Sequence, residues 1–269
     1  MNQSSSKLKT YIYSLWVLTA LSVLLFTISM FVSFDASTGY FNNSFLSYMQ
    51  KALVIVSVLF FVSIMFVIPK GTFSAEAPKN TRITMFSSLF CGVLYAAGTV
   101  MAFLAVVNNA SKITPRGKYI FFGIVITGIL SAIYFILDAI FSDKDFAPLK
   151  IIPAIALIIN LFLSIVYHHL DLFVGINTPR KTLLFVGFVV AALFIVQELR
   201  FKVAESQPRA YVLFGSCTTL LCSVMSIPGI IAHIAGSVKD GAFLPFYLMG
   251  LVLAVYAFAK LFAYVKSND

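Results

Sequence analysis

Long apolar runs separated by short polar segments make up almost the whole chain. Eight of these runs contain roughly 20 mainly apolar residues, the length a helix needs to cross about 30 Å of hydrocarbon. We place the spans near residues 11–32, 52–68, 83–107, 119–141, 151–173, 182–201, 211–236 and 242–265. The runs are continuous and do not alternate as transmembrane strands do. The pattern predicts an all-α polytopic transmembrane helix bundle of about eight spans.

The segments between the runs are short, and only 33–51 and 69–82 exceed a dozen residues. We therefore expect residues 1–269 to form a single integral membrane domain with no separate soluble domain. The first run is longer than the apolar region of a signal peptide and is not followed by a small-residue cleavage site. We interpret it as a span.

Composition supports the membrane assignment. The chain is 60% hydrophobic and 11% charged, whereas soluble domains are about 45–50% apolar and about 25% charged. The net charge of +9 arises from basic residues that lie mostly between the apolar runs. There they meet lipid phosphates, so we expect the lipid bilayer as partner and not a nucleic acid.

The distribution of basic residues also predicts an orientation. With eight spans, the side that carries both termini holds 12 Lys and Arg residues and the other side holds 7. Cytoplasmic segments carry the excess of Lys and Arg. We therefore expect a multi-pass protein of a cell membrane with both termini in the cytoplasm.

Polar residues follow one helical face in the third, fourth, fifth and seventh spans. The stripes are Thr84, Ser88, Cys91, Tyr95 and Thr99; Thr127, Ser131, Tyr134 and Asp138; Asn160, Ser164, Tyr167 and Asp171; and Ser216, Thr219, Ser223, Ser226 and His233. Such stripes either join helices by hydrogen bonds or line a polar path. We expect the four stripes to face a common interior.

The ionisable residues of the spans sort into two layers. Near the ends on the side of the termini lie Asp138 and Glu198, with Lys260 as a partner for Glu198. Near the opposite ends lie His168, Asp171 and His233. Ionisable groups inside a membrane usually mark a site or a path, although interfacial ion pairing is the alternative. With Asn160 and Ser164, which lie between the layers, these residues are our candidates for a pathway or binding site.

Two further features carry chemistry. His168 and Asp171, three residues apart, share a helix face, and with His233 they offer nitrogen and oxygen ligands to a metal. No metal motif accompanies them, so we expect no metal, no cofactor and no catalytic residue. Pro228 and Gly229 lie inside the seventh span, where proline removes a backbone hydrogen bond. We predict a helix break there, and a simple kink is the alternative.

No motif in the chain indicates a known family. The aligned stripes, the expected helix break and the acidic groups favour a small-solute transporter or permease-like protein, with a small-molecule solute as its second partner. One alternative is a non-catalytic membrane component of a sensor or multi-subunit complex. Another is a membrane-embedded enzyme acting on a lipid or lipid-linked substrate. The absence of a reaction motif favours a protein that is not an enzyme.

Overall fold

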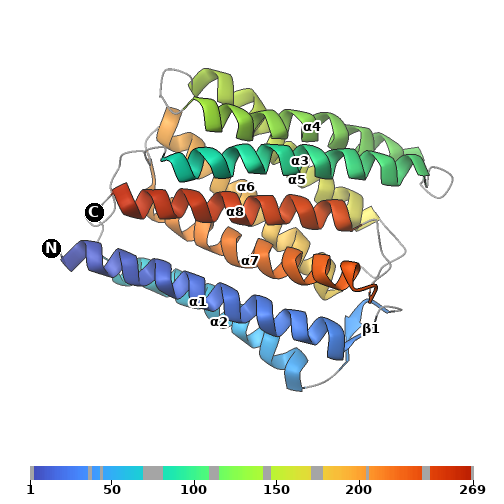
Figure 1. Ribbon diagram of the computed structural model, residues 1–269, viewed down its shortest axis with the longest axis horizontal. Helices are drawn as coiled ribbons and strands as arrows, with labels where there is room; N and C mark the ends of the chain where they lie inside the picture. The colour runs from blue at the N-terminus through green and yellow to red at the C-terminus, as the bar shows by residue number, and fades with distance from the viewer. Residues whose placement is uncertain are drawn as a thin grey trace.

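A computed structural model describes residues 3–35, 38–42, 45–68, 81–108, 115–141, 147–170, 178–203, 206–237 and 243–267. Within these residues the chain forms eight helices, α1 (Gln3–Val32), α2 (Phe45–Val67), α3 (Arg82–Asn108), α4 (Pro115–Ile140), α5 (Ala147–Leu170), α6 (Pro179–Val203), α7 (Pro208–Ile234) and α8 (Leu244–Ser267). Two short antiparallel strands, β1 (Phe34–Asp35) and β2 (Tyr40–Phe41), lie between α1 and α2. Both chain ends lie at the same end of the bundle (Figure 1). The predicted all-α bundle of eight spans is confirmed.

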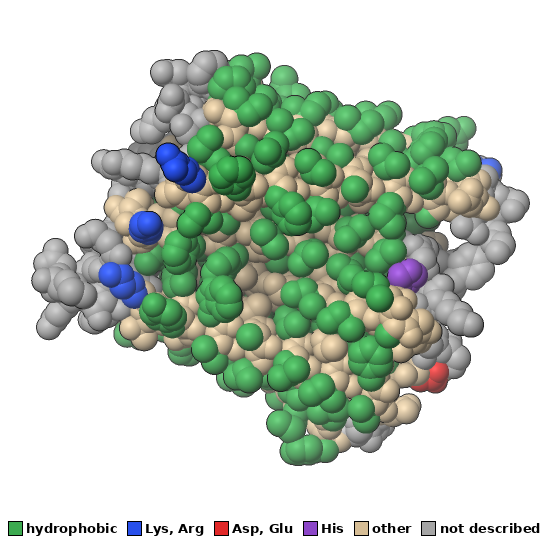
Figure 2. All heavy atoms as spheres, in the orientation of Figure 1, with side chains coloured by type: hydrophobic (Ala, Val, Ile, Leu, Met, Phe, Trp, Pro, Cys, Tyr) green, Lys and Arg blue, Asp and Glu red, His purple; other side chains and the backbone are tan. Residues whose placement is uncertain are grey.

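The outside of the bundle is apolar. All eight helices are long and hydrophobic enough to cross a membrane. Large apolar side chains such as Trp16, Phe66 and Phe122 are more than half exposed. Figure 2 shows hydrophobic side chains over most of one face, with Lys and Arg gathered at the end where the chain termini lie. Exposed apolar surface of this extent suits hydrocarbon and not water, so the chain is a multi-pass membrane protein.

Six helices form a closed ring. Each of α3 to α8 packs against the next one in the chain, and α8 packs back against α3. Helices α1 and α2 lie outside the ring, where both pack on α7. In the most apolar 18-residue segment of each helix, 78% of the residues are buried in α7 and 72% in α8, against 22% in α2. The interior of the ring is therefore where polar side chains can avoid lipid.

Seven of the eight helices begin earlier than hydropathy predicts, and α2 and α5 show the consequence for polar residues. Helix α2 starts at Phe45, seven residues before the predicted start of its span, and its first turns bury Ser47 and Gln50. Helix α5 starts at Ala147, which places Lys150 inside the helix and buries it. Hydropathy assigns such polar residues to loops because it does not register neighbouring helices that cover them.

The predicted break at Pro228 and Gly229 does not occur. Helix α7 continues through both residues to Ile234. A continuous helix keeps the remaining backbone groups paired, as apolar surroundings require. Gly229 has a packing role instead: a Cβ atom there would lie 2.5 Å from Cε2 of Tyr247 on α8.

We expect Gly229→Ala to destabilise the bundle. The added methyl group must displace the Tyr247 ring, and overpacking of this kind costs about 1–3 kcal/mol. Gly187→Ala is the matched control, because the nearest atom to a Cβ there would be Cys222 Sγ at 3.5 Å, an ordinary van der Waals contact. Alanine favours a helix by up to about 1 kcal/mol over glycine, so the control should be neutral or stabilising. Thermal unfolding in detergent measures both, and equal midpoints would contradict the packing argument.

Candidate functional site

Four charged side chains meet inside the ring, and we name them the charge cluster: Asp138 on α4, Lys150 on α5, Glu198 on α6 and Lys260 on α8. Lys260 Nζ lies 2.6 Å from Asp138 Oδ2 and 3.3 Å from Glu198 Oε1. Lys150 Nζ lies 3.3 Å from Asp138 Oδ1. All four side chains are at most 4% exposed. The predicted approach of Glu198 to Lys260 is confirmed, and Asp138 shares the same ammonium group.

Hydroxyl groups connect the two carboxylates. Tyr256 OH lies 3.1 Å from Asp138 Oδ2 and 2.8 Å from each carboxylate oxygen of Glu198. Tyr134 OH donates to Glu198 Oε2 at 2.9 Å and lies 3.2 Å from Tyr256 OH. A phenol has one proton to donate, so Tyr256 can serve only one carboxylate at a time. Ser88 on α3 donates to Asp138 Oδ2 at 3.2 Å, which brings a fifth helix to the cluster.

Helical spacing explains how these side chains converge. Tyr134 and Asp138 are four residues apart on α4, as are Tyr256 and Lys260 on α8. Residues four apart lie one above the other on a helix face, so each tyrosine lies one turn away from the charged residue of its own helix. Sequence reasoning missed Lys150 and Tyr256. The spacing of four from Lys260 was the available signal for Tyr256, while Lys150 precedes its apolar run and was assigned to a loop.

The cluster is not explained by stability alone. As ionised groups the four side chains sum to zero charge, which makes their burial tolerable. Replacing a buried ion pair by apolar side chains of similar volume is nevertheless often neutral or stabilising, because desolvation offsets the attraction. Charged groups held inside a membrane bundle therefore indicate a site or a path.

A second set of buried polar side chains joins α3, α4 and α5. Tyr95 OH on α3 donates to Asn160 Oδ1 at 2.6 Å, and Asn160 Nδ2 donates to Ile124 O at 2.7 Å and to Thr127 Oγ1 at 3.0 Å. Asn160 thus joins α5 to α3 and α4. Ser164 is buried and donates to Asn160 O within its own helix. The polar stripes of the third, fourth and fifth spans do meet.

The stripe on α7 is directed elsewhere. Its Ser216 accepts a hydrogen bond of 2.7 Å from Tyr11 on α1. Its Ser226 lies against Gly250 on α8. According to the helix contacts, α7 packs on α6, α8, α1 and α2. The expectation that all four stripes share one interior is wrong for Ser216 of α7, because its hydroxyl is hydrogen-bonded to α1, which lies outside the ring.

At the end opposite the chain termini, an arginine is held among aromatic rings. Arg180 Nε donates to Tyr247 OH at 2.6 Å. The Arg180 guanidinium carbon lies 4.6 Å from the centroid of the Phe243 ring and 5.5 Å from that of Phe34. The His168 ring stacks on Phe243 with centroids 4.5 Å apart and is 1% exposed. Sequence reasoning identified His168 but not Arg180, which precedes the predicted sixth span.

The predicted group of His168, Asp171 and His233 stays a prediction. Asp171 lies outside the described residues. His233, in the last turn of α7, is half-buried, and within the described residues no contact joins it to His168. Among those residues, no three His, Cys, Asp or Glu side chains gather as metal ligands would.

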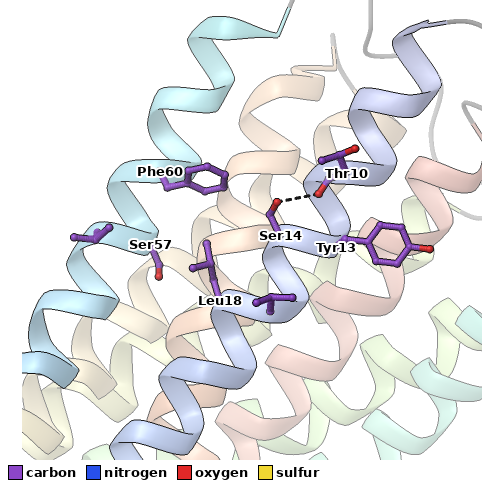
Figure 3. Close-up of a pocket in the computed structure, with 8 residues that line it drawn as sticks. Thr10, Tyr13, Ser14, Leu18, Ser57 and Phe60 are labelled. Atoms are coloured by element: carbon purple, nitrogen blue, oxygen red, sulfur yellow. Dashed lines mark hydrogen bonds between the residues drawn. The ribbon is translucent and has the colours of Figure 1, made fainter. Parts of the chain in front are cut away.

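A separate groove of about 450 Å³ lies between α1 and α2, outside the ring (Figure 3). Apolar side chains, including Val17, Leu18 and Phe60, form much of its wall. Ser14 and Ser57 also line it, but each donates its hydroxyl to a carbonyl of its own helix. This groove suits a hydrocarbon chain of the surrounding lipid, and the polar chemistry of the molecule lies in the ring.

No protein-family model, curated protein or solved structure matches this chain.

We expect Lys260→Met to lower the free energy of unfolding by about 3–5 kcal/mol, because it leaves a buried acidic charge without its cation. The double variant Lys260→Met with Glu198→Gln removes one charge of each sign and should recover more than half of that loss. Lys266→Met, at an exposed position of the same helix, is the control and should change little. Titration with sodium dodecyl sulfate measures the free energies, and strictly additive single losses would contradict charge coupling.

Proposed function

We propose that the protein is a small-solute transporter whose path runs through the six-helix ring formed by α3 to α8. The observation that carries this proposal is the charge cluster, in which two acids and two lysines from four helices are buried at one end of the ring. Intramembrane ionisable groups that face a bundle interior mark solute and ion paths more often than they serve packing.

The contacts of the cluster favour rearrangement. Lys260 contacts both carboxylates, and Tyr256 is within hydrogen-bond distance of both. Loss of one contact therefore leaves another in place, so partners can exchange without exposing an isolated charge. A solute or proton that competes for one carboxylate would change which helices are tied together. This is the bistable behaviour that coupled transport needs.

Polar groups also follow the length of the ring. On α5, Asn160 lies 10 residues beyond Lys150 and His168 another 8 beyond Asn160; at 1.5 Å per residue these steps are about 15 and 12 Å. The charge cluster closes one end, while Arg180 with Phe243 and Tyr247 closes the other. We infer that the structure represents a state closed at both ends, from which each end opens in turn.

We expect a cysteine at position 88 to become accessible to water during this cycle. In a background with Cys91, Cys217 and Cys222 replaced by alanine, Ser88→Cys should react with a membrane-impermeant cationic methanethiosulfonate in proteoliposomes. The cysteine thiolate attacks the sulfur of the reagent and displaces methanesulfinate, and hydrocarbon surroundings disfavour the thiolate form. Glu198→Gln weakens the cluster and should raise the rate further.

Phe90→Cys is the matched control, because Phe90 is 55% exposed on the lipid side of α3, about 3 Å in depth from Ser88. The rate at position 88 should exceed that at position 90 about tenfold or more. Equal protection of both positions, unchanged by Glu198→Gln, would contradict the transport proposal and favour a structural component of a larger complex.

A further inference from the structure

The start of α6 gathers buried polar and cationic side chains at the end of the ring opposite the chain termini (Figure 1). We call four residues the α6 start cluster: Thr178, Arg180 and Lys181, together with His168 from α5. Thr178 and Lys181 are 0% exposed, His168 is 1% and Arg180 is 7% exposed. The positive charges of Lys181 and Arg180 act on the His168 ring. His168 and Arg180 also pack on the same Phe243 ring.

Two members of this cluster have unused hydrogen-bonding capacity. Within the part of the chain that the structure describes, Thr178 Oγ1 and both ring nitrogens of His168 are buried without a hydrogen-bond partner. Thr178 occupies the position before a helix start, where a threonine hydroxyl normally bonds the backbone of the first turn. Buried polar groups in native proteins are almost always paired, so these atoms have the capacity to bond a bound group.

The positive charges at the start of α6 are unfavourable for the N-terminus of a helix. The N-terminus of a helix carries a partial positive charge, so acidic groups are favoured there and cations are not. Helix α6 instead begins Pro179-Arg180-Lys181 and has no acidic residue in its first turn. Helix N-termini bind phosphate and carboxylate groups through their outward N–H groups and this positive potential. Cations at the same place strengthen the attraction for an anion.

We propose that the α6 start cluster binds the oxyanion group of a small anion, a phosphate or a carboxylate. Lys181 and Arg180 supply positive charge, and the Thr178 hydroxyl and the His168 ring supply the hydrogen bonds. The aromatic rings of Phe243 and Tyr247 exclude water around the group. This inference rests on the proposed transport function in one respect: it names anions as the solute class.

The test is anion binding by the full-length protein in detergent micelles. Thermal unfolding is followed by the reaction of the three buried cysteines with a thiol-reactive fluorophore. Sodium phosphate, sulfate and acetate are titrated against sodium chloride at constant ionic strength. We expect a saturable rise of the unfolding midpoint with phosphate and sulfate, or with acetate, because a ligand that binds only the folded state stabilises it.

Matched variants locate the binding. Lys181→Met should weaken the apparent affinity about tenfold or more, as expected for the loss of a charge-assisted hydrogen bond. Thr178→Val, which keeps the shape of the side chain, should weaken it without loss of folding. Lys51→Met removes a cation from an exposed position near the start of α2 and should leave the affinity unchanged. No saturable rise, or one equal in Thr178→Val and the wild type, would overturn the proposal.

A further arm separates the sources of the anionic group. If a lipid headgroup supplies the phosphate, phosphatidylglycerol added to the micelles raises the midpoint in the wild type, and the rise is smaller in Thr178→Val. If a free anion binds, inorganic phosphate, sulfate or acetate suffices. Uptake of labelled phosphate and acetate into proteoliposomes tests the transport step separately. Binding that depends on Thr178, together with uptake no faster than in empty liposomes, would keep the anion site and contradict the transport function.

Discussion

An acidic side chain inside a membrane bundle needs cations and hydroxyl groups from neighbouring helices within reach. In this protein Asp138 and Glu198 meet that condition through Lys260, Lys150 and Tyr256. Because these groups come from different helices, the requirement fixes how α4, α5, α6 and α8 lie relative to one another. The closed ring, the depth of each helix and the burial of α8 are all consistent with this single electrostatic condition.

Much of this architecture was predictable from hydropathy, because a membrane imposes a length on every span. The meeting of Glu198 with Lys260 was also predictable, since both residues lie at similar depth in their spans. Lys150 was not, because its burial depends on the end of α4 covering the start of α5. The arrangement of Arg180 was hidden for the same reason: its aromatic partners Phe34 and Phe243 come from segments far apart in the chain. The local sequence pattern predicts how deep in the membrane a residue lies, whereas tertiary packing decides which polar residues are buried.

The two ends of the ring differ in electrostatic character. The charge cluster is balanced within itself, while the described residues at the start of α6 bring together cations and imidazole. Helix α6 connects the two, with Arg180 and Lys181 at its first turn and Glu198 near its last. The cations at the first turn oppose the helix dipole, whereas Arg200 in the last turn matches it.

The position of Lys260 has a consequence for biogenesis. Helices enter the membrane in chain order, and α8 follows every other member of the ring. Until α8 inserts, neither Glu198 nor Asp138 has met the ammonium group of Lys260, which contacts both of them in the complete bundle. The charge cluster is therefore complete only when α8 arrives. Closure of the ring and pairing of its charged side chains then become a single, late step of assembly.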